Sequence, residues 1–460
     1  MELLLNPVVL AVLLMLLLAL LRVHVVFSLI VSALVGGLVA KIPADQIRAG
    51  LKLADDAPLD GLSQLKYTIH VFEEGITAGT TTALSYAVLG AFAVAISYSG
   101  LSQLLANAII RRVQSGARGT VKVLLLGALL LAGVLSQNLI PVHIAFIPIL
   151  LPPLLTVMNR LQLDRRAVAC VLTFGLVCTY MFIPYGFGDI FIRQILLGNI
   201  ERFGMDVAAV NTYKALALPA LGMAVGLAVA LFYSYRRPRA YADRPVEGAE
   251  QQLTVEKAKV WVAALAVLLA FLAQKYTGSL IFAGLVGFAI FMAGRVIRWQ
   301  QADTVFNNGI RMMSMVGFIL ISANGFAAVM HASHGIEPLV QQTLATFGAS
   351  KSILALAMLL LGLLITMGIG SSFSTLPIIA AVYVPLCAQI GFSPTATVAL
   401  IGTAGVLGDA GSPTSDSALG PTMGLNADGQ HDHIRDTVIP TFLHYNLPLV
   451  LFGWLAALIL

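Results

Sequence analysis

A cluster of polar residues ends an apolar run near the C-terminus. Residues 397–407 are mostly apolar, and Gly408-Asp-Ala-Gly-Ser-Pro-Thr-Ser-Asp416 follows them directly. Glycine and proline interrupt a helix, and the freed backbone groups then need partners. In a membrane such an interruption is tolerated only inside protein or beside a polar cavity, and interrupted helices mark the binding sites of secondary transporters. The stretch 405–417 is therefore our first candidate for an ion or substrate site.

Two carboxylates lie in this stretch, Asp409 and Asp416. A carboxylate at membrane depth is costly and indicates function. Asp409 directly follows the apolar run, so it is the stronger candidate to ligate a cation, pair with a substrate amine or carry a proton. Asp416 has two open interpretations, a second site carboxylate or a cap for the following helix. The hydroxyl and backbone oxygens of the same stretch complete this half of the candidate site, at Ser412, Thr414 and Ser415.

Two other apolar segments, residues 121–158 and 352–390, are interrupted by polar clusters near their midpoints. Each has arms of about 15 residues around its interruption, which is short for a full crossing, so both are interpreted as re-entrant hairpins, with full crossings as the alternative. The polar residues at the two tips are Ser136, Gln137 and Asn138 in the first hairpin and Ser371, Ser372, Ser374 and Thr375 in the second. Such neutral oxygens suit Na⁺, and the candidate Na⁺ ligands are Asn138, Ser371, Thr375 and Asp409.

Four further residues are candidates with open alternatives. Tyr185 and Asp189 follow Pro184, where residues 167–189 form a second apolar run with an interruption. Asp189 is either a site residue or a residue at the membrane interface. His143 is either a proton carrier or a buried polar group with a partner. Asn324 lies within an apolar span and either faces a cavity or packs between helices.

His431-Asp432-His433 has the residue types of a metal site. No third or fourth ligand is evident nearby, so we expect a solvated loop instead. The chain has no phosphate-binding G-x-x-x-x-G-K-[ST] motif, which argues against ATP-driven transport. No cofactor is expected beyond a coupling ion, Na⁺ or H⁺.

The composition indicates a multi-pass membrane protein. The 460 residues are 58% hydrophobic and only 11% charged, with a mean hydropathy of +0.90. Soluble domains carry about 25% charged residues, and several apolar runs here approach the ~20 residues of a membrane span. The net charge of +5 is attributed to basic loops rather than to nucleic-acid binding.

The order of apolar and polar segments predicts two repeats, residues 1–235 and 260–460. Residues 236–259 hold six of the 27 Lys and Arg residues and are expected to be a cytoplasmic linker. Phe306-Asn-Asn-Gly-Ile310 in the second repeat echoes Phe72-Glu-Glu-Gly-Ile76 in the first. Each repeat has a hairpin, 121–158 or 352–390, and a broken helix, 167–189 or 397–417. We also expect surface segments at 101–113 and 337–347.

Charge and crossing number predict that the repeats are inverted. Basic residues flank the first hairpin on both sides, whereas Lys351 is the only Lys or Arg between Arg311 and Arg435. The first hairpin should therefore enter from the cytoplasm and the second from outside. About ten crossings with two opposed hairpins form an all-α inverted repeat, the pattern associated with alternating access.

The residues near Asp409 carry a resemblance to a known family. Gly408-Asp-Ala-Gly-Ser-Pro-Thr-Ser-Asp416, Gly420-Pro-Thr-Met-Gly-Leu-Asn426 and Pro440-Thr-Phe-Leu-His-Tyr445 resemble the NhaC-like branch of the ion transporter superfamily, and within it the predicted amino-acid (histidine) permeases. The resemblance covers nearly the whole chain. It implies a dimeric elevator-type transporter of the inner (plasma) membrane, with scaffold and transport domains, whose site is shaped by the hairpin tips and residues 409–416.

Two functions within transport stay open, and a third class is remote. The first is cation-coupled uptake of a small amino acid, with histidine as one candidate. The second is Na⁺/H⁺ antiport without an organic substrate. An intramembrane enzyme is disfavoured because a twofold inverted layout has no role in such an enzyme. The expected partners are an ion or small-molecule substrate, the lipid bilayer and a second copy of the chain.

Overall fold

The computed structural model describes residues 6–460 except 22, 41, 55, most of 101–117, most of 139–149, 245–255, most of 336–349, 370–371 and 414. Every regular element formed by the described residues is a helix, which confirms the all-α class. Among these residues, six helices are long and apolar enough to cross a membrane, and five shorter apolar helices accompany them. The protein is therefore a multi-pass membrane protein, while ten crossings remain a prediction.

The N-terminal part ends in a very long helix. The helices here are α1 (Pro7–Leu20), α2 (Val25–Val39), α3 (Ala44–Leu51) and α4 (Gly61–Ser97). Helix α4 has 37 residues and a length of about 55 Å. It begins with a capping box, in which the Asp60 carboxylate accepts from the Ser63 backbone N–H at 2.8 Å.

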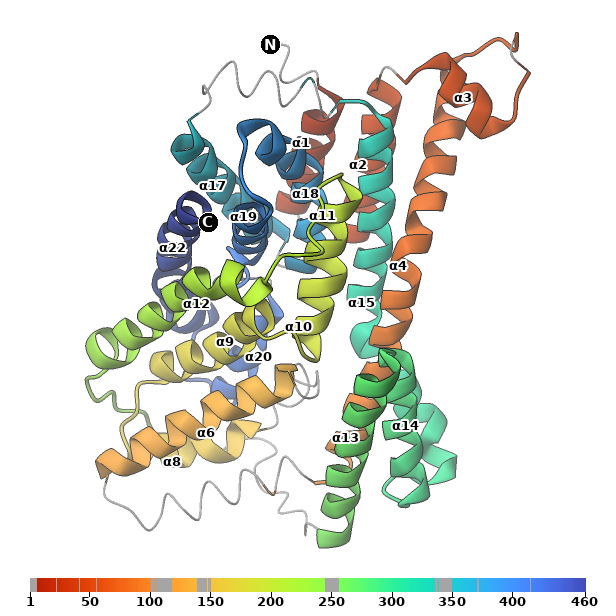
Figure 1. The fold of residues 1–460 in the computed structure, drawn as a ribbon. Coiled ribbons are helices and arrows are strands. Elements are labelled where there is room, and N and C mark those ends of the chain that lie inside the picture. Colours follow the sequence, from red (N-terminus) through yellow and green to blue (C-terminus); the bar gives the residue numbers. More distant parts are fainter. Residues whose placement is uncertain are drawn as a thin grey trace.

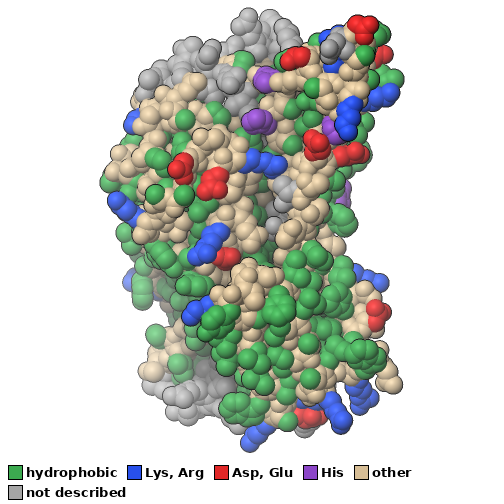
Figure 2. All heavy atoms as spheres, turned by 45° about the vertical axis from the view of Figure 1, so that its right-hand side comes forward, with side chains coloured by type: hydrophobic (Ala, Val, Ile, Leu, Met, Phe, Trp, Pro, Cys, Tyr) green, Lys and Arg blue, Asp and Glu red, His purple; other side chains and the backbone are tan. Residues whose placement is uncertain are grey.

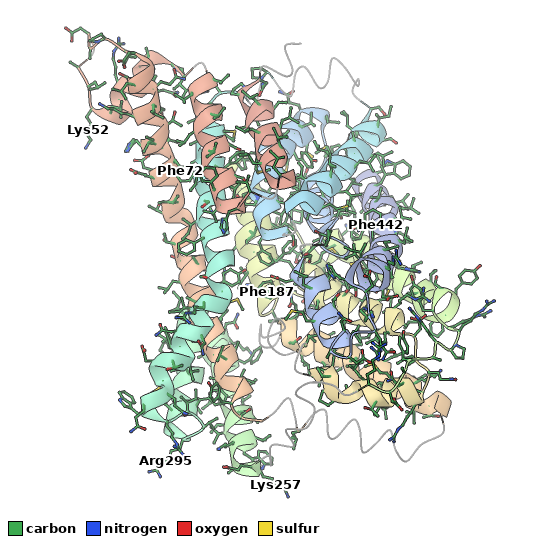
Figure 3. The ribbon with its side chains drawn as sticks, turned by 180° about the vertical axis from the view of Figure 1, so that it is seen from behind. Lys52, Phe72, Phe187, Lys257, Arg295 and Phe442 are labelled. Carbon is green, nitrogen blue, oxygen red and sulfur yellow. The ribbon has the colours of Figure 1, made fainter. Side chains whose placement is uncertain are left out.

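Helix α4 packs along helix α15 (Trp299–Ala332), and the two stand side by side in Figures 1 and 3. Two glycines allow the close approach. A Cβ on Gly309 would lie 2.1 Å from the Ala91 backbone nitrogen, and one on Gly75 would lie 3.0 Å from the Gly325 Cα. Gly75 and Gly309 belong to the two echoed Phe-x-x-Gly-Ile segments. Each glycine faces small residues of the partner helix, Gly325 of α15 and Ala91 of α4 respectively.

Helix α14 (Leu280–Ala293) packs against α4, and α13 (Lys257–Thr277) packs against α14. Lys257 and Arg295 lie at the same end of the molecule (Figure 3), which is the end that the charge pattern assigns to the cytoplasm. Figure 2 shows a broad apolar surface in the lower half of the molecule. Exposed apolar side chains on these two helices include Trp261, Leu268, Tyr276 and Phe282.

The segments expected to be hairpins start at opposite ends of the molecule (Figure 1). The first contains α6 (Arg118–Asn138), the short 3-10 helix η2 (Pro152–Leu154) and α8 (Leu155–Arg160). The second contains α17 (Lys351–Ile369) and α18 (Ser372–Ile390). Helix α6 has 21 residues, so its arm is longer than the sequence suggests, and Ser136–Asn138 form its last turn. The surface segments expected at 101–113 and 337–347 lie almost entirely outside the described residues.

Both expected helix interruptions are present. The first separates α9 (Arg165–Phe182) from the continuous stretch of α10 (Phe187–Asp189), the π-helix η3 (Ile190–Leu197) and α11 (Gly198–Arg202). The second separates α19 (Pro394–Val406) from α20 (Asp416–Leu425). The remaining elements are α12 (Thr212–Val229) with η4 (Ala230–Ser234), and a C-terminal run of η5 (His433–Val438), α21 (Ile439–Thr441), η6 (Phe442–Asn446) and α22 (Leu447–Ile459). Helices α9, α19 and α20 are packed together in the interior and carry the candidate site.

Candidate functional site

The site begins at the interruption between α19 and α20. Gly408 and Gly411 have φ angles of 91° and 139°, a region that favours glycine, and they turn the chain away from the helix axis. Ser415 caps α20 by accepting from the Ser417 backbone N–H at 3.1 Å. Asp409 lies between the two glycines, so the local sequence directs its side chain into the interior.

Three hydroxyl groups surround the Asp409 carboxylate. Ser415 donates to Oδ1 at 2.5 Å, Ser372 donates to Oδ2 at 3.1 Å, and the Tyr180 hydroxyl also donates to Oδ2. The Tyr180 and Ser372 hydroxyls are themselves 2.7 Å apart. The Oδ2 atom and these two hydroxyl oxygens therefore form a closed triangle of hydrogen-bonding contacts.

These groups come from separate parts of the chain. Tyr180 lies in the last turn of α9, just before the first interruption, and Ser372 is the first residue of α18. Asp409 is 6% exposed and the two serines are fully buried. None of the ion pairs within the described part of the chain involves Asp409. A buried carboxylate without a basic partner is costly, so the arrangement suits a group that binds a proton or metal cation.

Aromatic rings separate this site from α4. Phe187 lies centrally, between the α4–α15 pair and the rest of the molecule (Figure 3). Its ring is 4.6 Å from the Phe373 ring and 5.6 Å from the Tyr86 ring of α4, and the Tyr180 ring is 5.8 Å from Phe373. The Tyr86 hydroxyl is buried and has no hydrogen-bond partner among the described residues. Access to Asp409 from the α4 side therefore requires movement of these rings.

Asn138, at the tip of the first predicted hairpin, binds the backbone at the first helix interruption. The Asn138 amide donates to the carbonyl oxygens of Thr179, Ile183 and Tyr185 at 3.0–3.1 Å. Ser136 donates to the carbonyl of Gly133 in its own helix. Asn138 thus binds the freed carbonyls of the broken helix, and it is not among the hydrogen-bond partners of Asp409.

Asn446, in η6, holds the second interruption in the same way. Its Oδ1 accepts from the Gly408 backbone N–H at 2.8 Å, and its Nδ2 donates to the Ala410 carbonyl at 3.2 Å. Ser412 adds a bond to the Met367 carbonyl at 3.1 Å. The backbone on both sides of Asp409 is therefore fixed by groups that do not touch its carboxylate.

The other expected site residues lie in varied surroundings. Asp189 forms an ion pair with Arg193 at 3.1 Å, and Asn324 accepts from Arg202 of α11 at 2.9 Å. Tyr185 is 54% exposed and Asp416 is exposed at the first position of α20.

The remaining candidates are Gln137, whose Oε1 is buried without a partner among the described residues, Thr375, which is fully buried, and Ser374, of which only the backbone is described. His143, Ser371 and Thr414 lie outside the described residues.

The loop at residues 426–436 differs from the expectation of a solvated loop. Arg165 is fully buried and binds both Asp428 oxygens, at 2.7 and 2.5 Å. His431 is 2% exposed, and its Nε2 lies 2.7 Å from the Thr437 hydroxyl. Burial lowers the pKa of His431 from 6.5 to about 4. The loop is packed because Arg165, far away in sequence, supplies the charge that its carboxylate needs.

Linker residues also cover this loop. Arg239 binds Asp436 at 2.7 Å, and Tyr241 stacks beneath the Arg165 guanidinium at 4.3 Å. No group of three or more His, Cys, Asp or Glu side chains that would hold a metal occurs in the part of the chain that the structure describes. The contact of His431 with the Thr437 hydroxyl joins it to the helix that follows the loop.

Two contributors to the site were missed by sequence reasoning. Tyr180 lies in an apolar run where a buried tyrosine is ordinary, and Asn446 lies in the apolar final span. The usable signal for Tyr180 is its position four residues before Pro184. For Asn446 it is an amide side chain within a membrane span, where polar residues need partners.

Comparisons with known proteins agree with this architecture. A family model described as the Na⁺/H⁺ antiporter family matches residues 171–454, and a second, described as the Na⁺-H⁺ antiporter family, matches residues 6–113. An uncharacterized membrane protein of Vibrio parahaemolyticus is 52% identical over 99% of this chain and 100% of its own length. A Bacillus subtilis protein, YuiF, named provisionally as an amino acid transporter, is 44% identical over 85% of this chain and 90% of its own.

Solved structures share the fold. The crystal structure of the Alcanivorax borkumensis YdaH transporter superposes with a TM-score of 0.62 at 20% identity, covering 98% of both chains. The structure of Neisseria gonorrhoeae MtrF, described as illuminating a class of antimetabolite efflux pumps, gives a TM-score of 0.57 at 15% identity over 88% of both chains. At such identities the likeness concerns the fold alone.

Proposed function

The chain belongs to the Na⁺/H⁺ antiporter family and is a secondary transporter rather than an enzyme, and we propose that it couples movement of Na⁺ or H⁺ to uptake of a small amino acid. The observation that carries the proposal is the Asp409 carboxylate, buried among three hydroxyl donors without a basic partner. The name of the B. subtilis relative supports an amino acid as the substrate class. Histidine is one candidate, on the resemblance described in the sequence analysis.

The number of available protons favours H⁺ as one coupling ion. The three oxygens concerned are Asp409 Oδ2, Tyr180 Oη and Ser372 Oγ. Three contacts join the three oxygens, but an ionised Asp409 leaves only the two hydroxyl protons to fill them. A proton on Asp409 supplies the third, so each oxygen then donates once and accepts once. Na⁺ is the alternative, because one carboxylate and three hydroxyls are hard oxygen ligands.

Na⁺/H⁺ antiport without an organic substrate is the second candidate. The burial of Asp409 behind aromatic rings favours it, because a proton or Na⁺ needs far less space than an amino acid. Amino-acid uptake requires the start of α18 at Ser372 to move away from Asp409.

The decisive experiment uses protein reconstituted in liposomes. Uptake of a panel of labelled amino acids is measured with imposed Na⁺ or pH gradients, for wild type and Asp409→Asn. We expect gradient-driven uptake of at least one amino acid and loss of the gradient dependence in the variant. If no amino acid is taken up while Na⁺ and pH gradients dissipate each other, the antiporter function replaces the uptake function. Unchanged coupling in Asp409→Asn removes this carboxylate from the mechanism.

We further propose that residues 1–235 and 260–460 are inverted repeats with two re-entrant hairpins. The reciprocal contacts of Gly75 and Gly309 support a twofold relation between α4 and α15. The opposite starting ends of α6 and α17 support opposed hairpins. Helices α4, α13, α14 and α15 would form a scaffold, and the helices around Asp409 would move as the transport domain of an elevator, in a homodimer.

The contact between Arg202 of α11 and Asn324 of α15 provides a test of this motion. Both positions are replaced by cysteine in a chain whose Cys170, Cys178 and Cys387 are changed to alanine, and they are joined by a short bismaleimide. We expect the cross-link to stop transport, whereas labelling each single cysteine with a monofunctional maleimide leaves transport intact. Full activity of the cross-linked protein would exclude movement between these helices.

A further inference from the structure

A groove opens on the surface of the protein where α6, α9 and the end of α12 meet. Helix α9 lies between the other two in Figure 1. The groove has a volume of about 400 Å³, and its walls are formed mainly by apolar side chains, including Leu126, Leu130, Val171 and Leu231. Two of its lining residues, Val123 and Phe232, are 73% and 76% exposed. An exposed apolar groove of this kind marks a surface that contacts a membrane, a protein partner or a ligand.

One end of this groove is basic. Lys122, Arg236 and Arg237 line it at the end that the charge pattern assigns to the cytoplasm. None of the three forms an ion pair within the described residues. Asp164 also lines the groove, but its carboxylate is already bound by the Arg166 guanidinium at 2.6 Å. The basic end therefore keeps a positive charge available for an external anion.

We propose that this groove binds one anionic glycerophospholipid of the cytoplasmic leaflet. An acyl chain would lie along the apolar wall, and the phosphate would lie among Lys122, Arg236 and Arg237. The chemistry matches at both ends, because basic residues beside a membrane surface attract anionic headgroups and apolar walls exclude water from the chain. The site is independent of Asp409 and of the transported substrate, and it ties the start of α6 to the segment leading into the linker.

The headgroup contact is tested with delipidated protein in detergent. Thermal unfolding and native mass spectrometry are recorded with phosphatidylglycerol or phosphatidylethanolamine of identical acyl chains. We expect one retained phosphatidylglycerol and a raised Tm, and neither effect with phosphatidylethanolamine. A combined Lys122→Gln, Arg236→Gln, Arg237→Gln variant should bind phosphatidylglycerol about 100-fold more weakly, from about fivefold per charge. Equal binding of the two lipids would overturn the proposal.

The matched control removes three charges at the same end of the molecule but outside the groove, with Lys257→Gln, Arg295→Gln and Arg298→Gln. We expect it to bind phosphatidylglycerol as wild type does, and an equal loss in both triple variants would mean diffuse attraction rather than a site.

The acyl-chain contact is tested at Gly127 of α6, which lines the groove. A Cβ there meets no other atom within 4 Å, so Gly127→Leu should fold and fill the groove, whereas Gly127→Ala should leave it open. We expect Gly127→Leu to lose the retained lipid and Gly127→Ala to keep it. Destabilisation of Gly127→Leu in lipid-free detergent would show that another segment of the chain fills the groove. Retention of the lipid by Gly127→Leu would show that the lipid binds at another place. Either result refutes the assignment.

Discussion

Removing the Tyr180 hydroxyl should change ion binding without unfolding the protein. In Tyr180→Phe the ring keeps its packing, 4.8 Å from Phe191 and 5.8 Å from Phe373, because only the oxygen is lost. The variant removes one donor to Asp409 and also the neighbour of the Ser372 hydroxyl. The Asp409–Ser372–Tyr180 triangle is then reduced to a single contact, at 3.1 Å.

The size of the effect follows from the type of bond. A hydrogen bond to a charged group contributes about 1.5–3 kcal/mol, which corresponds to about 10- to 100-fold in affinity. We therefore expect Na⁺ to bind about 10- to 100-fold more weakly, and where H⁺ is the coupling ion we expect the pH dependence of transport to change. Ion-dependent shifts in Tm and the ion dependence of uptake in liposomes both report this change.

Tyr445→Phe is the matched control. Tyr445 is also fully buried, and its hydroxyl donates to the Cys170 carbonyl at 2.5 Å, but it does not contact Asp409. Both variants should lose similar stability, about 1–3 kcal/mol. Only Tyr180→Phe should change ion dependence. Equal ion dependence in wild type and both variants would refute the role of the triangle, and equal weakening in both would show a general loss of stability.

Two further variants test the fold. Gly309→Val should cost at least about 3 kcal/mol or prevent folding, because its Cβ would lie 2.1 Å from the Ala91 nitrogen, whereas Gly127→Ala should fold normally in the same expression and melting assay. The buried His431 has a pKa of about 4 in the folded state against 6.5 when exposed, so the unfolded chain binds the proton more readily between these values and stability falls as pH drops. Between pH 7 and 5 the free energy of unfolding should fall by about 2 kcal/mol. Thermal melts at both pH values should show no such fall in His431→Gln. An identical pH response in wild type and variant would contradict the burial argument.

The sequence alone predicts the position of the site but only part of its composition. Asp409 is recognisable because a carboxylate beside a helix interruption in an apolar run has few structural roles. Ser372 and Ser415 follow from the same pattern of hydroxyls at helix ends. Tyr180 does not, because a tyrosine in an apolar helix is usually a packing residue. Its role depends on α9 lying against α18 and the second interruption, contacts between segments about 190 and 230 residues apart.

The loop at residues 426–436 also shows that contacts distant in sequence cannot be predicted from local composition. Residues 426–436 contain acids and histidines, which by composition alone indicate a solvated loop. The structure buries Asp428 because the fully buried Arg165 binds both of its oxygens, and no local pattern reveals a partner 263 residues away. The interruptions and the echoed Phe-x-x-Gly-Ile segments are local, and these were predictable, whereas the 21-residue length of α6 was not.

The side chains that hold the two interruptions differ in chemistry from those around Asp409, and this difference has a physical reason. An asparagine amide has fixed donor and acceptor atoms, so Asn138 and Asn446 bind backbone groups whose hydrogen-bonding character never changes. A hydroxyl rotates and both donates and accepts, so Tyr180 and Ser372 can adapt when Asp409 gains or loses a cation. We therefore expect the amides to keep the broken helices in place through a transport cycle in which the hydroxyls reorganise. On this reasoning Asn446→Ala should destabilise the fold at every pH, whereas a loss of stability confined to one ionic state would place Asn446 in the ion site itself.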